Sequence, residues 1–134
     1  MTAAAGPGDA AAVLVYEPPA GVAVDDLEPV LTGAFERIRA AVERGEPVVI
    51  ALDERDVEGV GEPAAAALAH GLLGLARALA LEGRKPGWRV AVLAAPPELD
   101  AGERRRWIEH LAGSGAASGA LVRLGGEHLG RVPA

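Results

Sequence analysis

The hydrophobic residues of this chain gather into short continuous runs, and the longer stretches between the runs have helical spacing. The runs lie at residues 12–16, 47–52, 89–93 and 120–124. Strands that are apolar on both faces are typical of a parallel sheet covered on both sides, so we expect the first run to be a central strand. The pattern predicts a three-layer α/β fold, in which a mainly parallel sheet of about four strands carries helices on both faces through right-handed crossovers.

Apolar residues that recur every three or four positions predict two long helices. Asp25 or Asp26 is expected to cap the first helix, which ends at Gly45. The second helix is expected to begin at Pro63, where a missing N–H costs no hydrogen bond, and to end at about Glu82.

A third, shorter helix is predicted at about residues 102–111, with Asp100 as its cap. Residues 53–62 are expected to form a polar, acidic loop. Its carboxylates lack the glycine and the terminal glutamate of a calcium loop, so we expect a solvated turn. These carboxylates belong to Asp53, Glu54, Asp56 and Glu58. The spacing of the three histidines is not that of metal ligands, so no metal site is predicted. The histidines are His70, His110 and His128.

Length, net charge and cysteine content indicate the number of domains, the class of partner and the cellular location. The 134 residues suit one domain, and residues 1–10 are expected to be a flexible leader because no basic segment precedes an apolar one. The net charge of -6 argues against a nucleic-acid partner, since the one basic run, 104–106, suits the solvated face of a helix. The absence of cysteine fits a cytoplasmic location, and the apolar helix reads as a buried element of the fold rather than a membrane span.

Four segments carry motifs in a recognisable order: residues 13–21, 31–35, 71–93 and 118–126. Their order is similar to that of the second half of the short-chain dehydrogenase/reductases. The resemblance implies a truncated Rossmann-like fold, and it makes residues 11–134 a single reductase-like half-domain.

The resemblance also places the family's catalytic Asn, Ser, Tyr and Lys on this chain. They fall on Val30, on Leu52 or Asp53, on Ala65 and on Ala69. In the family, the tyrosine acts as a general acid whose pKa is lowered by the neighbouring ammonium, and neither alanine can replace these groups. The resemblance therefore implies a pseudoenzyme without catalytic residues.

No cofactor is expected either. The turn after the first run is Glu17-Pro-Pro-Ala-Gly21, in which two prolines remove amide donors and a carboxylate repels phosphate. A dinucleotide site needs a glycine-rich turn at this place, followed by the start of a helix.

The whole pattern most resembles two degenerate half-domains. One is the non-catalytic N-terminal domain of high-molecular-weight ketoacyl reductases. The other is the structural subdomain of polyketide ketoreductases, which the Pro97-Glu-Leu-Asp100 segment resembles. Both imply a scaffold for a β-ketoreductase of fatty acid or polyketide metabolism that works on carrier-linked acyl groups.

The second long helix is too apolar for a helix that only lies on a sheet, because His70 and Arg77 are its only polar residues between positions 64 and 81. We therefore expect its surplus apolar surface to be covered by a partner, either a second copy or a full-length short-chain reductase. The predicted interface comprises Phe35, Ile38, Ala65, Leu68, Ala69, Leu72, Leu73, Leu75 and Leu79.

The sequence thus predicts a non-catalytic, reductase-like subunit that docks through its two long helices and stabilises or regulates its partner. Two alternatives stay open. One is an oxidoreductase subunit whose active site is completed by another chain, and the other is a small-molecule-binding α/β domain.

Overall fold

The computed structural model describes residues 12–125, which fold around a four-stranded sheet in the order β1-β2-β3-β4. The strands are β1 (Leu14–Tyr16), β2 (Val48–Asp53), β3 (Val90–Ala95) and β4 (Leu121–Arg123), and each neighbouring pair is parallel. The predicted α/β fold with a parallel sheet is confirmed.

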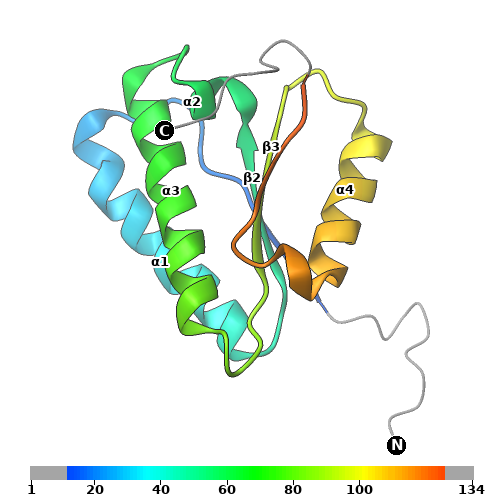
Figure 1. Ribbon diagram of the computed structural model, residues 1–134. Helices are drawn as coiled ribbons and strands as arrows, with labels where there is room; N and C mark the ends of the chain where they lie inside the picture. Colours follow the sequence, from blue (N-terminus) through cyan, green and yellow to red (C-terminus); the bar gives the residue numbers. More distant parts are fainter. Residues whose placement is uncertain (1–11, 126–134) are drawn as a thin grey trace, which may run out of the picture.

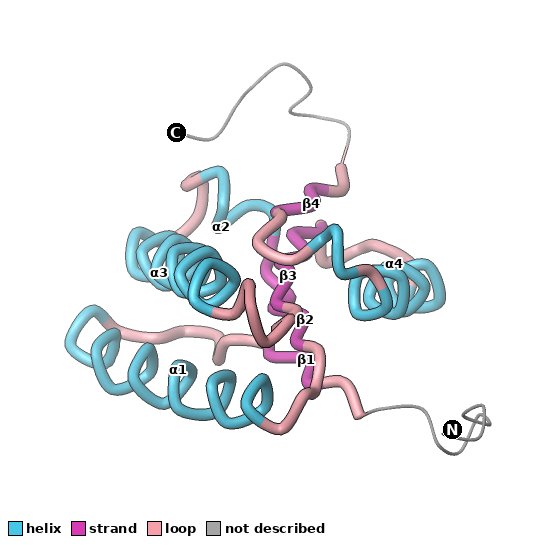
Figure 2. The backbone as a smooth tube through the Cα atoms, turned by 60° about the horizontal axis from the view of Figure 1, so that its bottom comes forward, coloured by secondary structure: helices cyan, strands magenta, loops and turns pink. Residues whose placement is uncertain are grey.

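Helices lie on both faces of this sheet, as Figures 1 and 2 show. The long helices α1 (Leu27–Glu43) and α3 (Pro63–Glu82) lie side by side on one face, and α4 (Ala101–Gly113) covers the other face. Three short elements complete the described part, namely η2 (Val24–Asp26), α2 (Glu54–Glu58) and η3 (Gly115–Ala117). The predicted three layers are therefore present.

The two central strands are buried on both faces, which explains their continuous apolar sequences. All six residues of β3 and the first five of β2 are buried. Alternate side chains enter opposite cores, as the period of a strand requires. Ile50 and Val92 pack under α1 and α3, whereas Val49 and Leu93 pack under α4.

The last crossover has the opposite hand to the first two. The strands follow one another in a single direction across the sheet, so the hand depends on the face that each connecting helix covers. With α1 and α3 on one face and α4 on the other (Figure 2), the first two crossovers are right-handed and the β3-to-β4 crossover is left-handed. The expectation of right-handed crossovers is wrong for this connection, because α1 and α3 already fill one face while the apolar Val49 and Leu93 need cover on the other.

The first strand is not central in the described part of the chain, so that expectation is wrong. β1 pairs only with β2 and forms an edge. Leu14 and Tyr16 pack under the long helices, while Val15 faces the opposite side and belongs to neither core. The strand is short and half-buried because α4 does not extend over it.

The predicted starts of α3 and α4 are confirmed, whereas the predicted side-chain cap of α1 is absent. Asp100 caps α4, since its Oδ2 accepts the Glu103 amide at 3.0 Å, and α3 begins at Pro63 as expected. Asp25 and Asp26 make no capping side-chain bond to α1. Asp26 does occupy the N-cap position of α1, and both residues belong to η2, which leads directly into that helix.

The predicted interface lies only partly on the surface. Three of its residues, Phe35, Ala65 and Leu75, remain partly exposed on the chain. The other six are at most 4% exposed and fill the core between the long helices and the sheet, so they offer almost no surface to a partner: these are Ile38, Leu68, Ala69, Leu72, Leu73 and Leu79.

Gly83, directly after α3, provides a test of the packing. A Cβ at Gly83 would lie 2.4 Å from the Trp88 Cβ, whereas a Cβ at Gly74 would meet nothing within 4 Å. We expect Gly83→Ala to lower the free energy of unfolding by about 1–3 kcal/mol through overpacking. Gly74→Ala, on the exposed side of α3, should raise it by about 0.5–1 kcal/mol. Urea denaturation measures both, and equal effects of the two variants would contradict this packing.

Candidate functional site

A cleft of about 390 Å³ lies where β1, β2 and β3 end, at the edge where open α/β sheets bind ligands. The loop after β1, the end of β2 and the loop after β3 form its rim, and α3 forms one wall. Its lining residues are Glu17 to Val22, Ala51 to Asp53, Asp56, Ala65, Leu68, Ala69, Ala95 to Pro97 and Arg104.

The cleft brings together three of the four positions onto which the resemblance placed catalytic groups. Leu52 with Asp53, Ala65 and Ala69 all line it. Val30 does not line it; it lies half-buried on α1 against the core. The wall formed by α3 is therefore aliphatic and offers no hydroxyl or ammonium group at positions 65 and 69.

Three of the four ionisable side chains that line the cleft take part in an ion pair. Arg104 Nη2 lies 2.5 Å from Glu17 Oε1, which ties α4 to the loop after β1. Asp53 accepts the Arg55 amide at 2.9 Å and so caps α2. Burial alone would raise the pKa of Asp53, but hydrogen bonds from the Arg55 side chain and amide, with the charge of Arg55, outweigh burial and lower it.

Asp56 has the opposite electrostatic environment. Burial and the neighbouring negative charge of Asp53 raise the pKa of Asp56, and the attraction of Arg55 offsets this only in part. Two carboxylates of the same wall therefore have pKa values moved in opposite directions, although they lie three residues apart.

The one tyrosine does not supply the missing proton donor. Tyr16 is 7% exposed in the core under the long helices and does not line the cleft. Burial raises the pKa of Tyr16, although the nearby Arg37 guanidinium, 5.9 Å from the ring centre, opposes this. A tyrosine that serves as a general acid near neutral pH needs a lowered pKa.

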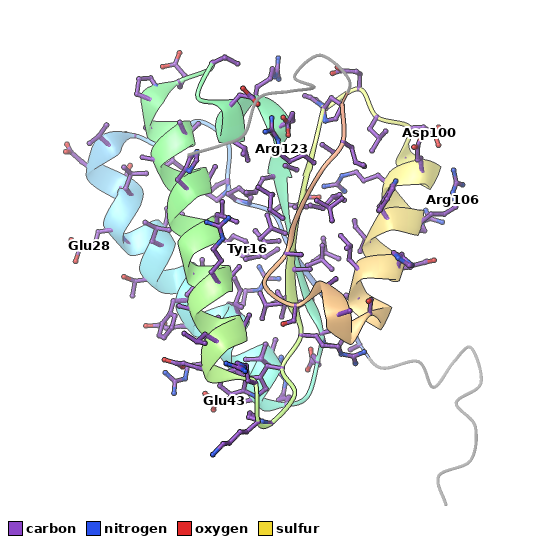
Figure 3. The ribbon with its side chains drawn as sticks, viewed as in Figure 1. Tyr16, Glu28, Glu43, Asp100, Arg106 and Arg123 are labelled. Carbon is purple, nitrogen blue, oxygen red and sulfur yellow. The ribbon has the colours of Figure 1, made fainter. Side chains whose placement is uncertain are left out.

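A buried charge cluster lies beside the cleft, and no local sequence pattern indicates it. Arg123, at the end of β4, donates to Glu54 at 3.0 Å through its Nε and contacts Glu58 through Nη2 (Figure 3). The side chains of Glu54 and Glu58 are 6% and 8% exposed. The predicted solvated acidic loop is therefore wrong: these residues form α2, whose carboxylates need a cation 65 or more positions away in sequence.

A dinucleotide does not fit this cleft in the manner of a Rossmann site. The turn after β1 places Pro18 and Pro19 in the lining, so two of its positions offer no amide, and Glu17 adds a negative charge. Within residues 12–125, no group of three or more acidic or histidine side chains could hold a metal ion.

The Arg123 cluster predicts a large loss of stability when its cation is removed. Arg123→Met should lower the free energy of unfolding by about 3–5 kcal/mol, because it leaves two buried carboxylates without their guanidinium. Arg105→Met, at an exposed position of α4, serves as the control and should change little. Urea denaturation at neutral pH measures both, and a loss below about 1 kcal/mol for Arg123→Met would refute this assignment.

Asp53 and Asp56 predict opposite pH effects. Since the pKa of Asp56 is raised on folding, its ionised form costs stability above that pKa, and Asp56→Asn should stabilise the protein at neutral pH. Since the pKa of Asp53 is lowered, its ionised form stabilises the fold, and Asp53→Asn should destabilise it, although asparagine still caps α2. For both variants, the difference in unfolding free energy from the unsubstituted chain should shrink as the pH falls and the carboxylates become protonated. Denaturation at several pH values tests this, and the same sign for both variants would contradict it.

Comparison with known proteins identifies the fold. No protein-family model and no curated protein matches the sequence. A doubly substituted short-chain dehydrogenase/reductase from Serratia marcescens matches with a TM-score of 0.60 and 20% identity, over 84% of this chain and 63% of that one. A short chain dehydrogenase from Bacillus anthracis matches with the same score and identity, over 90% and 66%. The chain spans about two thirds of these structures, and it has a truncated form of the Rossmann-like fold of short-chain dehydrogenase/reductases.

Proposed function

We propose that this chain is a non-catalytic subunit with a short-chain-reductase fold, which docks through α1 and α3 and stabilises or regulates its partner. The partner is a second copy or a reductase of the ketoacyl type. The resemblance to degenerate half-domains of ketoacyl and polyketide reductases gives this partner class, and we place the subunit in the cytoplasm with it.

The composition of the cleft carries the proposal. A carbonyl reductase needs a proton donor beside its substrate, and the positions that face the cleft from α3 are Ala65 and Ala69. The carboxylates Asp53 and Asp56 accept hydrogen bonds when ionised and cannot replace a tuned hydroxyl. The fold is thus retained while the groups that would do the chemistry are absent from this wall.

The outer layer supports docking. Only 33% of the most apolar stretch of α3 is buried in the chain, although that stretch is apolar enough to span a membrane by length and composition. Its position between β2 and β3 favours a core helix of a water-soluble fold over a membrane span. Its exposed side carries the small residues Ala67, Gly74 and Ala78 beside the polar His70 and Arg77, and Leu81 is 66% exposed. Small residues on a helix surface allow another helix to approach closely.

The neighbouring helix adds to this surface. A Cβ at Gly71 would lie 3.0 Å from Leu31, so α1 and α3 already pack tightly as one pair. Phe35 and Leu75 are partly exposed along the pair. Charged residues such as Glu28 and Glu43 project outward from α1 (Figure 3), and they mark the polar border of the surface.

The size of the cleft favours a second candidate, a small-molecule-binding domain. About 390 Å³ lies within the range of ligand pockets, and apolar walls with a few polar groups are typical of them. A subunit whose active site is completed by another chain would use the same cleft. NADPH titration separates these candidates from the docking role.

Substitutions on the exposed side of α3 test docking. The chain, alone and co-expressed with full-length short-chain reductases, should have a mass above the 13.6 kDa of a monomer when analysed by light scattering. Ala67→Glu combined with Ala78→Glu should restore the monomer mass, because each buries a charge at the proposed contact. Ala116→Glu, at an exposed position outside that surface, is the matched control.

Two results would contradict the proposed role. One is a monomeric chain that co-purifies with no reductase, or whose association survives both substitutions. The other is saturable NADPH binding with reduction of a β-ketoacyl thioester by this chain alone.

A further inference from the structure

The loop between α3 and β3 collects positive charge without counter-charge. Arg84, Lys85 and Arg89 lie within six residues, yet none forms an ion pair with any residue of the described range 12–125. The chain as a whole carries a net charge of -6, so a concentration of free cations is unusual here. Such clusters attract anions.

This loop is held in one conformation. The amides of Gly87 and Trp88 both donate to the Gly83 carbonyl, at 2.8 and 3.0 Å. The Trp88 ring packs on Gly83, where no side chain would fit. The Ser118 hydroxyl donates to the Trp88 carbonyl at 3.0 Å and accepts the Val90 amide at 3.2 Å. The loop is therefore fixed before any ligand arrives.

A cavity of about 360 Å³ opens beside this loop, at the amino edge of the sheet. Arg84 and Arg89 both line it, together with Trp88, the glycines of the loop and residues of the η3 connection. The loop amides at Gly87 and Trp88 already donate within the chain, whereas the guanidinium groups of Arg84 and Arg89 form no ion pair within residues 12–125. Its volume lies in the range of small-molecule sites.

The other side of Trp88 differs in charge. A second cavity of about 280 Å³ shares Trp88 and Arg89 but is lined by Glu43 and Glu46. Those carboxylates already pair with Arg39 and Arg44, at 2.7 and 2.5 Å. The two carboxylates of this smaller cavity are thus occupied, whereas Arg84 lines only the larger cavity and Arg89 lies between the two.

The helix macrodipole explains only part of this arrangement. Arg84 and Lys85 follow the carboxyl end of α3, where cations stabilise the helix. Arg89 lies next to the start of β3, away from any helix end, and still lines the cavity. A helix-end role of Arg84 and Lys85 therefore explains neither the position of Arg89 nor the cavity.

We propose that this cavity binds a small organic phosphate, whose phosphoryl group lies between Arg84 and Arg89 and whose apolar body contacts Trp88. Guanidinium groups bind phosphate through paired hydrogen bonds, and the indole offers a flat apolar surface. The site lies at the edge of the sheet opposite the cleft, so it is independent of the docking role and of the lost catalytic positions.

Tryptophan fluorescence tests the proposal directly. The chain has two tryptophans, so Trp107→Phe leaves Trp88 as the single reporter. Titration with phenyl phosphate should change its emission saturably. Arg84→Gln and Arg89→Gln should each weaken binding by about tenfold or more, the effect of removing a hydrogen bond to a charged group. Arg105→Gln with Arg106→Gln on α4, the matched control, should leave affinity unchanged. Calorimetry on the unsubstituted chain gives the same measurement without the Trp107 change.

Several outcomes would overturn the site. The first is a fluorescence titration that does not saturate up to about 10 mM phenyl phosphate, which is weaker than any useful affinity. The second is that phenol binds as tightly as phenyl phosphate. The third is that the α4 control variant loses as much affinity as Arg84→Gln or Arg89→Gln. A fourth is binding of an acidic peptide in place of phenyl phosphate, which would make the loop a protein-docking surface. A lowered melting temperature for Arg84→Gln with unchanged affinity would leave that residue only its helix-end role and would also refute the proposal.

Discussion

The parallel pairing of β2 with β3 is the constraint on which the rest of the structure depends. Residues 48–53 pair with residues 90–95 in continuous register, and nearly all of these side chains are aliphatic and buried. A strand buried on both faces requires a helix layer on each face. The α1–α3 pair provides one layer and α4 the other, and the left-handed last crossover follows because α4 must return to the same sheet from the second face. The common direction of the strands then gathers their carboxyl ends into a single cleft.

Ion pairs hold β4, the last strand of the sheet. β4 is short and half-buried, and pairs with β3 through only three residues. Arg123 at its end is held by Glu54 and Glu58 of α2, with the Glu54 side chain 6% exposed. A buried ion pair adds little net stability compared with a well-packed apolar core, but it strongly disfavours any arrangement that separates the charges. The cluster therefore fixes where β4 ends relative to α2, and with it the wall of the cleft that carries Asp53 and Asp56.

Local signals explain which parts of this structure the sequence could predict. Pro63 and Asp100 act within one turn of their helices, and the start of α3 and the cap of α4 were correct. The central strands were clear because both of their faces are apolar. The edge position of β1, the hand of the last crossover and the burial of Glu54 depend on which segments meet in space, and Arg123 lies 69 positions from Glu54. The same limit applies to the site. Ala65 and Ala69, onto which the resemblance placed the catalytic Tyr and Lys, both line the cleft. The apolar excess of α3 led to an interface that includes Leu72 and Leu79, which the chain itself covers.

The two edges of the sheet differ in the charge of the side chains that line their cavities. The carboxyl edge holds a cleft with an aliphatic wall and carboxylates, one of which is neutralised by Arg104. The amino edge holds a cavity lined by Arg84 and Arg89 next to Trp88. Six residues of strand separate the edges by about 20 Å, so a ligand bound at one edge does not touch the other. The α1–α3 pair runs along the strands between the two edges (Figure 1), and α3 contributes Ala65 to the cleft at one end and Ala80 to the basic cavity at the other. The same helix thus forms part of both sites and of the proposed docking layer, so the substitutions that test docking and those that test phosphate binding must lie at different positions of the chain.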